Sequence, residues 1–422
     1  MTKTEPQDRT STMSLAAADL QDERLIHAEG LGGAIAGFGR RVRTGDLGSL
    51  PVIIGLVVIW AIFEILSPKF LSADNLVNLA MQSASEGIIA VGIVLVLLLG
   101  EIDLSVGSVS GVAAAILGVG MTSLHWPIIV AIIVALVVGA AVGALYGILF
   151  TRFGVPSFVI TLAGLLGFLG LQLWILGPLG SINLSFSSWI VQFANTWFLP
   201  PWVVYAIVLI AALAMLFSDL SRARRRREAG LSVQSLSVTL AKVIVLAVVL
   251  GGVAWYLSTD RGTGVMFVFF VLIVVLMQFL LKRTRWGRSI FAVGGNVEAA
   301  RRSGINTTFI YMSVFMLTSL FAIVGGILAA ARLSAASQSA GTGDVNLDAI
   351  AAAVIGGTSL FGGRGSAWSA LLGTVVIASI SSGLTLMNLG APQRYVITGA
   401  VLLLAVIVDS LSRRSRASHG QA

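Results

Sequence analysis

Long apolar runs alternate with short polar segments from residue 51 almost to the end of the chain. A membrane-spanning helix needs about 20 predominantly apolar residues, and most of the runs approach or exceed that length. The runs are Pro51–Leu66, Leu76–Leu99, Leu104–Met121, Trp126–Phe150, Ser157–Leu176, Pro201–Phe217, Leu236–Leu257, Val265–Leu281, Thr308–Ala331, Leu347–Phe361, Ala367–Leu389 and Tyr395–Val408. The pattern predicts an all-α fold: a polytopic transmembrane helical bundle of about twelve spans, in a range of about ten to fourteen, with broken or re-entrant helices.

The arginines lie between these runs and predict an orientation, because basic residues accumulate on the cytoplasmic side of a membrane. They cluster at 40–43, 222–227, 283–288 and 413–416. Residues 1–50 also carry acidic side chains and lack the apolar core of a signal peptide, so they are predicted to form a cytoplasmic tail. The transmembrane domain is predicted at 51–409, with cytoplasmic segments at 218–235 and 282–306 and a cytoplasmic C-terminal tail at 410–422.

Composition agrees with the apolar pattern and narrows the chemistry. The 422 residues are 57% hydrophobic and 11% charged, and the mean hydropathy is +0.96, which is far from the balance of a soluble domain. The net charge of +8 indicates attraction to anionic lipid of the inner leaflet and not to nucleic acid, because the arginines lie between apolar runs. The chain has no cysteine and only three scattered histidines, so no metal site is predicted.

No glycine-rich phosphate loop of the G-x-x-x-x-G-K-[ST] type occurs, so the chain is not expected to hydrolyse ATP by that route. A nucleophile with a histidine partner is also missing from the pattern. We therefore expect a protein that is not an enzyme and that binds no cofactor itself.

The longest charged segment between apolar runs, Arg283–Asn306, is predicted to contain a short cytoplasmic docking helix, Val297–Ser303, of about two turns. Asn296 is placed as an N-cap, Glu298 lies in the first turn, and Gly304 follows the end. Its predicted site residues are Gly294, Gly295, Asn296, Glu298, Ala300, Arg301, Arg302 and Gly304. A helix this short needs a partner surface, although its arginines are also explained if they only fix topology.

A few carboxylates stand at or near membrane depth, where they are costly and normally face the bundle interior or water. Glu101 and Asp103 lie at a helix break before Ser105. They are predicted either to cap the free N–H groups of the next helix or to take part in a solute path. Asp348 is a second candidate for the path. Ile102-Asp103 and Leu347-Asp348 each precede small apolar residues, which fits either an internal repeat or chance.

Five motifs in order resemble one family. They are GEIDLSVGS at 100–108, VPSFVITLAG at 155–164, AVGGNVEAARRSGIN at 292–306, LDAIAAAVIGGTSLFGG at 347–363 and LLLAVIVDS at 402–410. Together they resemble the membrane permeases of bacterial ATP-binding-cassette sugar importers, the group of the ribose, xylose and related monosaccharide systems. Glu101 before Ile102-Asp103, and the additional hairpin Leu236–Leu281, are similar to the xylose type. The tip of that hairpin, 260–264, lacks the proline expected there.

The resemblance implies a permease subunit in the bacterial inner membrane that forms the pathway for a monosaccharide, D-xylose or another pentose. It also implies three partners: cytoplasmic ATPase subunits that use ATP and Mg, an external sugar-binding protein, and a second permease copy in a homodimer. The segment around 294–304 would contact the ATPase. A secondary, ion-coupled transporter is the alternative, with Glu86, Glu101 and Asp348 as candidate ion sites. Broken helices argue against a purely structural or receptor protein.

Overall fold

The structure is a computed structural model that describes residues 50–229 and 233–390, together with residues 392, 393, 396, 397, 399, 400 and 403. Residues 1–49 of the predicted tail, most of the predicted span Tyr395–Val408 and the tail 410–422 lie outside the described residues. The described chain divides into two compact units. One contains Pro200–Thr259, and we call it the hairpin unit; the other, the larger unit, contains the remaining described residues. The two helices of the predicted hairpin Leu236–Leu281 therefore fall in different units.

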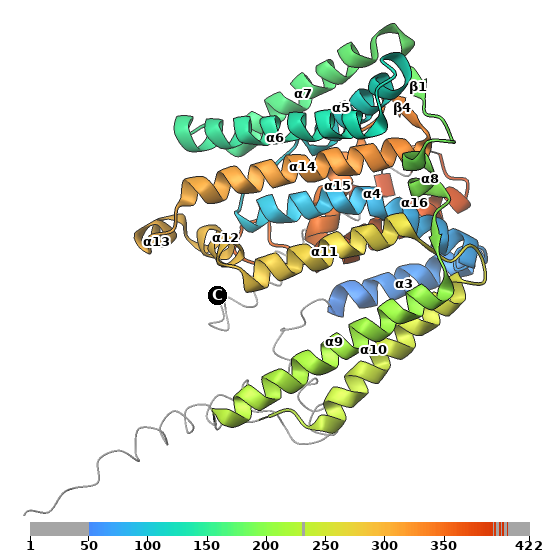
Figure 1. Cartoon of the computed structure of the whole chain (residues 1–422), viewed down its shortest axis with the longest axis vertical. Coiled ribbons are helices and arrows are strands. Elements are labelled where there is room, and N and C mark those ends of the chain that lie inside the picture. Colours follow the sequence, from blue (N-terminus) through green and yellow to red (C-terminus); the bar gives the residue numbers. More distant parts are fainter. Residues whose placement is uncertain are drawn as a thin grey trace, which may run out of the picture. The chain divides into compact units, whose positions relative to one another are not determined.

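The larger unit is an all-α bundle with two small sheets, and the predicted fold class is confirmed (Figure 1). Its main helices are α3 (Leu50–Leu66), α4 (Ala73–Leu98), α5 (Val106–Gly118), α6 (Ile128–Phe153), α7 (Ser157–Leu176), α11 (Val265–Arg283), α14 (Thr307–Leu333), α15 (Asp344–Ile355) and α16 (Trp368–Leu386). A π-helical turn, Val119–Ser123, extends α5. The hairpin unit consists of α9 (Pro201–Glu228) and α10 (Leu236–Leu257).

Nine helices in the described residues are long and apolar enough to cross a membrane. Each corresponds to one of the twelve predicted runs. Of the other three runs, the first is the 17-residue α3, and Leu347–Phe361 contributes only the C-terminal part of the 12-residue α15. A 12-residue helix rises about 18 Å, which is well short of the hydrocarbon thickness, so α15 is a partial span as the broken-helix prediction requires.

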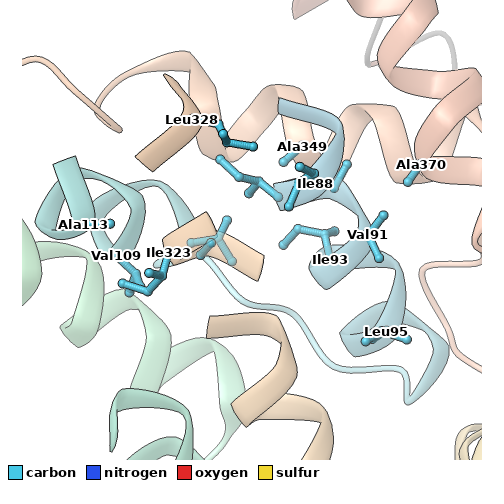
Figure 2. Packing of buried hydrophobic residues seen from close by; sticks show 14 of the residues in the cluster. Ile88, Val91, Ile93, Leu95, Val109, Ala113, Ile323, Leu328, Ala349 and Ala370 are labelled. Carbon is cyan, nitrogen blue, oxygen red and sulfur yellow. The ribbon is translucent and has the colours of Figure 1, made fainter. Parts of the chain in front are cut away.

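Helix α4 forms the core of the larger unit, because 89% of its most apolar 18-residue stretch is buried inside the protein. It packs against α14, α15, α16 and α11. Figure 2 shows Ile88, Val91 and Ile93 of α4 among side chains from α5, α14 and α15. A helix that is apolar on every face is stable when other helices surround it, and α4 is buried in this way.

Glycines let α14 approach its neighbours closely. A Cβ at Gly143 of α6 would collide with the backbone at Met316, and one at Gly147 would lie 2.8 Å from the Cα of Met312. On α14 itself, a Cβ at Gly326 would collide with the carbonyl oxygen of Ser110 in α5. These glycines therefore permit close packing of α14 against α5 and α6.

Short strands and one short helix gather at one end of the larger unit (Figure 1). Strand β1 (Ser181–Asn183) pairs antiparallel with β4 (Ala335–Ser337), and β2 (Phe198–Leu199) pairs with β3 (Thr263–Gly264). Helix α8 (Trp189–Asn195) lies between β1 and β2 in the sequence. We call this end the strand end. The opposite end carries α12 (Arg285–Gly295) and α13 (Val297–Arg302), and we call it the α13 end.

Within the hairpin unit, α9 and α10 pack against each other. The predicted apolar run ends at Phe217, but α9 continues as a helix through the arginines of the segment 218–235 to Glu228. Asp219 and Glu228 pair with Arg222 and Arg224 one turn away, at 3.7 Å and 3.0 Å. Such pairs offset part of the repulsion in a basic helical segment, which explains why the helix does not end at Phe217.

Candidate functional site

A helix occupies the position predicted for docking: α13, Val297–Arg302, is one residue shorter than predicted. Its N-cap is confirmed, because Asn296 Oδ1 accepts a hydrogen bond from the N–H of Ala299 at 2.9 Å. At the other end, Gly304 adopts a φ of 81°, in the left-handed region that favours glycine. Ala300 is buried and faces the bundle, while the charged residues are exposed.

On the exposed surface of α13 one carboxylate pairs with two arginines, so the helix keeps a net charge of +1. Glu298 pairs with Arg301 at 3.6 Å and with Arg302 at 3.2 Å, and the three side chains are 57%, 65% and 80% exposed. Exposed pairs of this kind contribute about 0–1 kcal/mol. The arginines can therefore exchange this carboxylate for acidic groups of a partner at little cost.

A second helix, α12, precedes α13, and the sequence analysis did not predict it. Gly294 and Gly295 are its last two residues, so they belong to a helix and not to a linker. Thr284 caps its start by accepting a bond from the N–H of Gly287, and Trp286 Nε1 donates to Ser313 Oγ of α14 at 2.8 Å. Basic residues and glycines interrupt its short apolar stripe. The sequence nevertheless contains two helix signals, the N-cap Thr284 and an apolar stripe that includes Ile290 and Val293.

Asp103 lies in the break between α4 and α5 and is 1% exposed. Its Oδ1 accepts hydrogen bonds from the N–H and the hydroxyl of Ser105, at 2.8 Å and 2.7 Å. Tyr146 of α6 in turn donates to Ser105 Oγ at 2.8 Å. Asp103 therefore satisfies the residue at the start of α5 and not the free N–H groups of its first turn, so the capping role is local and indirect. Burial raises the pKa of this carboxyl, and the bonds from Ser105 oppose the rise.

Glu101 does not cap α5. Its Oε2 accepts a hydrogen bond from Ser157 Oγ, the first residue of α7, at 2.6 Å. Ser157 Oγ also accepts a bond from the N–H of Ile102 at 3.4 Å. Burial raises the pKa of Glu101, and the bond from Ser157 opposes that rise. The GEIDLS and VPSF motifs, separated by about 50 residues, thus meet at one point.

Asp348 lies on α15, close enough to Asp344 for the two carboxylates to repel each other. Both carboxylates also repel that of Glu86 on α4. Two residues earlier, Asn346 accepts a hydrogen bond from the N–H of Gly107 in α5. Asp348 thus has carboxylate neighbours on α4 and α15. Glu101 instead bonds to Ser157 of α7, and Asp103 is linked through Ser105 to Tyr146 of α6. Among the described residues, no three His, Cys, Asp or Glu side chains are arranged to hold a metal ion.

The structure adds a polar residue that the sequence analysis missed, Gln172 of α7. It is fully buried, and its Nε2 donates to the carbonyl oxygens of Ser337, Gln338 and Ala340 at 3.0, 3.3 and 2.9 Å. These carbonyls belong to the non-helical stretch between α14 and α15, which runs beside α5. Backbone groups without helix partners must be satisfied in this way inside a membrane. A lone glutamine in the apolar run Ser157–Leu176 was the signal available.

Comparison with known proteins agrees with this arrangement. Residues 75–406 match the family described as branched-chain amino acid transport system, permease component. The chain therefore belongs to this family of membrane permeases. The xylose transport system permease protein XylH of Escherichia coli K12 is 37% identical over 345 residues, which is 82% of this chain and 87% of that protein.

Two further relatives cover similar shares. XylH of Haemophilus influenzae is 32% identical over 86% of this chain and 96% of its own length. The ribose import permease protein RbsC of Escherichia coli K12 is 33% identical over 85% of this chain and 92% of its own length. No solved structure matches the chain. The resemblance to permeases of the ribose and xylose type is thereby confirmed.

Proposed function

We propose that the chain is the permease subunit of an ATP-binding-cassette importer and forms the transmembrane pathway for a monosaccharide, D-xylose or another pentose. The observation that carries the proposal is the identity of 37% to a xylose transport permease over 82% of the chain. The family description names branched-chain amino acids. The relatives at 32–37% identity are described as xylose and ribose permeases, so a pentose is the substrate that the comparisons support better.

In this proposal ATP and Mg are used by a separate cytoplasmic ATPase, which docks on α12 and α13. An external binding protein delivers the sugar at the strand end, and a second copy of the chain completes a homodimer in the bacterial inner membrane. Both termini are cytoplasmic. The exposed arginines of α13 support this docking site. Acidic groups of a partner can bind them without breaking a buried ion pair.

The path residues divide by their surroundings. We propose that Glu101, Asp103 and Ser105 stabilise the break between α4 and α5. The carboxylate of Glu101 bonds to Ser157, and that of Asp103 bonds to Ser105. Asp348 is only partly buried on the short α15, so it is the carboxylate that we place on the sugar path. Sugar hydroxyls donate hydrogen bonds readily to carboxylate oxygens.

Reconstitution tests the class of transporter. Proteoliposomes that contain the permease with the ATPase and binding protein encoded beside it should take up D-xylose only with ATP on the ATPase side. Collapse of the proton and sodium gradients should leave the uptake unchanged. Uptake driven by an ion gradient without ATP would instead support the secondary transporter, with Glu86, Glu101 and Asp348 as ion sites.

Sidedness has a direct test, because the chain contains no cysteine. Single variants Ser303→Cys, after α13, and Ser187→Cys, before α8, place thiols at exposed positions at opposite ends of the larger unit. In intact cells with a permeable outer membrane, a membrane-impermeant maleimide should label only the variant at 187. Labelling of the variant at 303 under the same conditions would contradict a cytoplasmic α13.

A further inference from the structure

Three of the glycine-containing motifs meet at one backbone contact at the α13 end. They are Gly294 at the end of α12, Leu98–Gly100 at the end of α4, and Gly362-Gly363 in the loop between α15 and α16. We call this contact the glycine junction. The N–H of Gly363 donates to the carbonyl oxygen of Leu98 at 2.9 Å. Segments separated by about 70 to 265 residues in the sequence are thus held against one another by main chain.

The junction leaves no room for side chains. A Cβ on Gly294 would collide with the carbonyl oxygen of Leu98 and would lie 2.8 Å from the nitrogen of Gly363. A Cβ on Gly362 would lie 2.6 Å from the carbonyl oxygen of Gly294 and 2.9 Å from the nitrogen of Gly100. Both oxygens belong to main chain that cannot rotate away, so the contact transmits displacement as packed interiors do.

Each segment at the junction adjoins an irregular part of the bundle. Leu98 ends α4 and is followed at once by the break that holds Glu101 and Asp103. Gly362 and Gly363 lie in the loop after the short helix α15, which carries Asp348. Gly294 is separated from the cap of α13 only by Gly295. The segment proposed to dock the ATPase is therefore joined by backbone to two breaks at once.

We infer that the glycine junction transmits movement of α12 and α13 to the α4–α5 break and to the α15–α16 loop together, so that docking and opening of the path are coupled through main chain. Gly294, Gly362 and Gly363 are positioning residues in this inference and touch neither sugar nor ATPase. The inference rests on the proposed function. It adds the route by which one end of the bundle acts on the path.

Substitution of Gly294 by alanine tests the route. The Cβ would push α12 away from Leu98 while the exposed face of α13 stays unchanged. In reconstituted complexes, Gly294→Ala should retain its ATPase on purification, but uptake, and stimulation of ATP hydrolysis by sugar-loaded binding protein, should fall about tenfold or more. Gly170→Ala is the matched control, since it is the same change in a helix with no atom within 4 Å of the new Cβ. The control should behave as the wild type.

A measurement on a junction without substitutions covers the case in which Gly294→Ala does not fold. Spin labels on Ser303→Cys and Arg364→Cys, both exposed, report the separation of α13 from the α15–α16 loop. The inference requires this separation to be the same in the nucleotide-free and ATP-bound complexes. A separation that changes between the two states would overturn the inference, because the two segments would then move independently.

The outcomes for Gly294→Ala separate the junction from the proposed function. If the wild-type permease binds no ATPase and shows no ATP-dependent uptake, the proposed function fails before any variant is compared. If the wild type transports and Gly294→Ala transports equally well, only the junction is overturned. Loss of the ATPase from Gly294→Ala would also overturn it, since Gly294 would then belong to the docking surface.

Discussion

At the residue scale, the sequence singled out Asp103 correctly as a polar residue at a helix break, but not its partners. The structure shows one oxygen bonded twice to Ser105 and the other without a hydrogen bond to the described residues. Ser105 also accepts a hydrogen bond from Tyr146, so the carboxylate of Asp103 links the α4–α5 break to α6. No spacing rule predicts the contact with Tyr146, which lies about 40 residues away.

Asp103→Ala is expected to lower the amount of folded permease, because the N–H and hydroxyl of Ser105 lose their acceptor at a buried position. A buried donor left unsatisfied costs about 1–3 kcal/mol. Asp103→Asn keeps one acceptor oxygen and should be milder. Fluorescence-detected size exclusion of membrane extracts measures the folded fraction. Equal amounts of all three proteins, with transport lost only in the alanine variant, would place Asp103 on the sugar path.

Gln172→Leu is expected to destabilise the bundle at similar side-chain volume. The change removes the buried donor for three part-buried carbonyl groups, and a buried group left unsatisfied costs about 1–3 kcal/mol. The midpoint of thermal unfolding in detergent should fall clearly below that of the wild type. Gln234→Leu is the control, because Gln234 Oε1 accepts a hydrogen bond from Lys242 at an exposed position. Equal midpoints for Gln172→Leu and the wild type would show that the carbonyls have other partners.

At the element scale, caps and apolar runs located most helices, while connections were harder. Asn296 predicted the start of α13 because a cap is a local device whose donors lie within three residues. Helix α12 was not predicted because basic residues and glycines interrupt its short apolar stripe. Helix α9 extends beyond its apolar run because its exposed basic end carries no hydrophobic signal. The path of the backbone between α14 and α15 depends on Gln172 and on α5, which are remote in sequence.

Reversal of both arginines of α13 tests the docking surface. In Arg301→Glu with Arg302→Glu, Glu298 loses its cations and the exposed face becomes acidic, so an acidic partner surface is repelled. The variant should insert normally but should not retain ATPase subunits on purification, and uptake should stop. A compensating acidic-to-basic change on the ATPase should restore part of the uptake.

The control for that reversal is Arg225→Glu with Arg227→Glu at the end of α9, which changes the net charge by the same amount in the other unit. Arg283, Arg285 and Arg288 still fix the topology of the α12–α13 segment in the test variant. Wild-type amounts of bound ATPase together with normal transport in Arg301→Glu with Arg302→Glu would show that these arginines serve topology alone.

At the scale of the whole molecule, D-xylose uptake is expected to depend on this chain. A strain that lacks the gene, with other xylose routes removed, should fail to import labelled D-xylose, and a plasmid copy should restore import. Ribose import in the same strain is the comparison, because the relatives include permeases for both sugars. Unchanged xylose import together with a loss of ribose import would assign the chain to the second sugar.

The sequence by itself determined the membrane class, most of the spans and the capped helix α13. These features depend on length, hydropathy and donors within one turn of the chain, all of which are local. Only the tertiary structure decided that Gly294, Leu98 and Gly363 touch, that Glu101 bonds to Ser157, and that Gln172 supports a non-helical segment. These contacts join residues that are tens to hundreds of positions apart. Their existence depends on how the helices pack, which apolar periodicity does not specify.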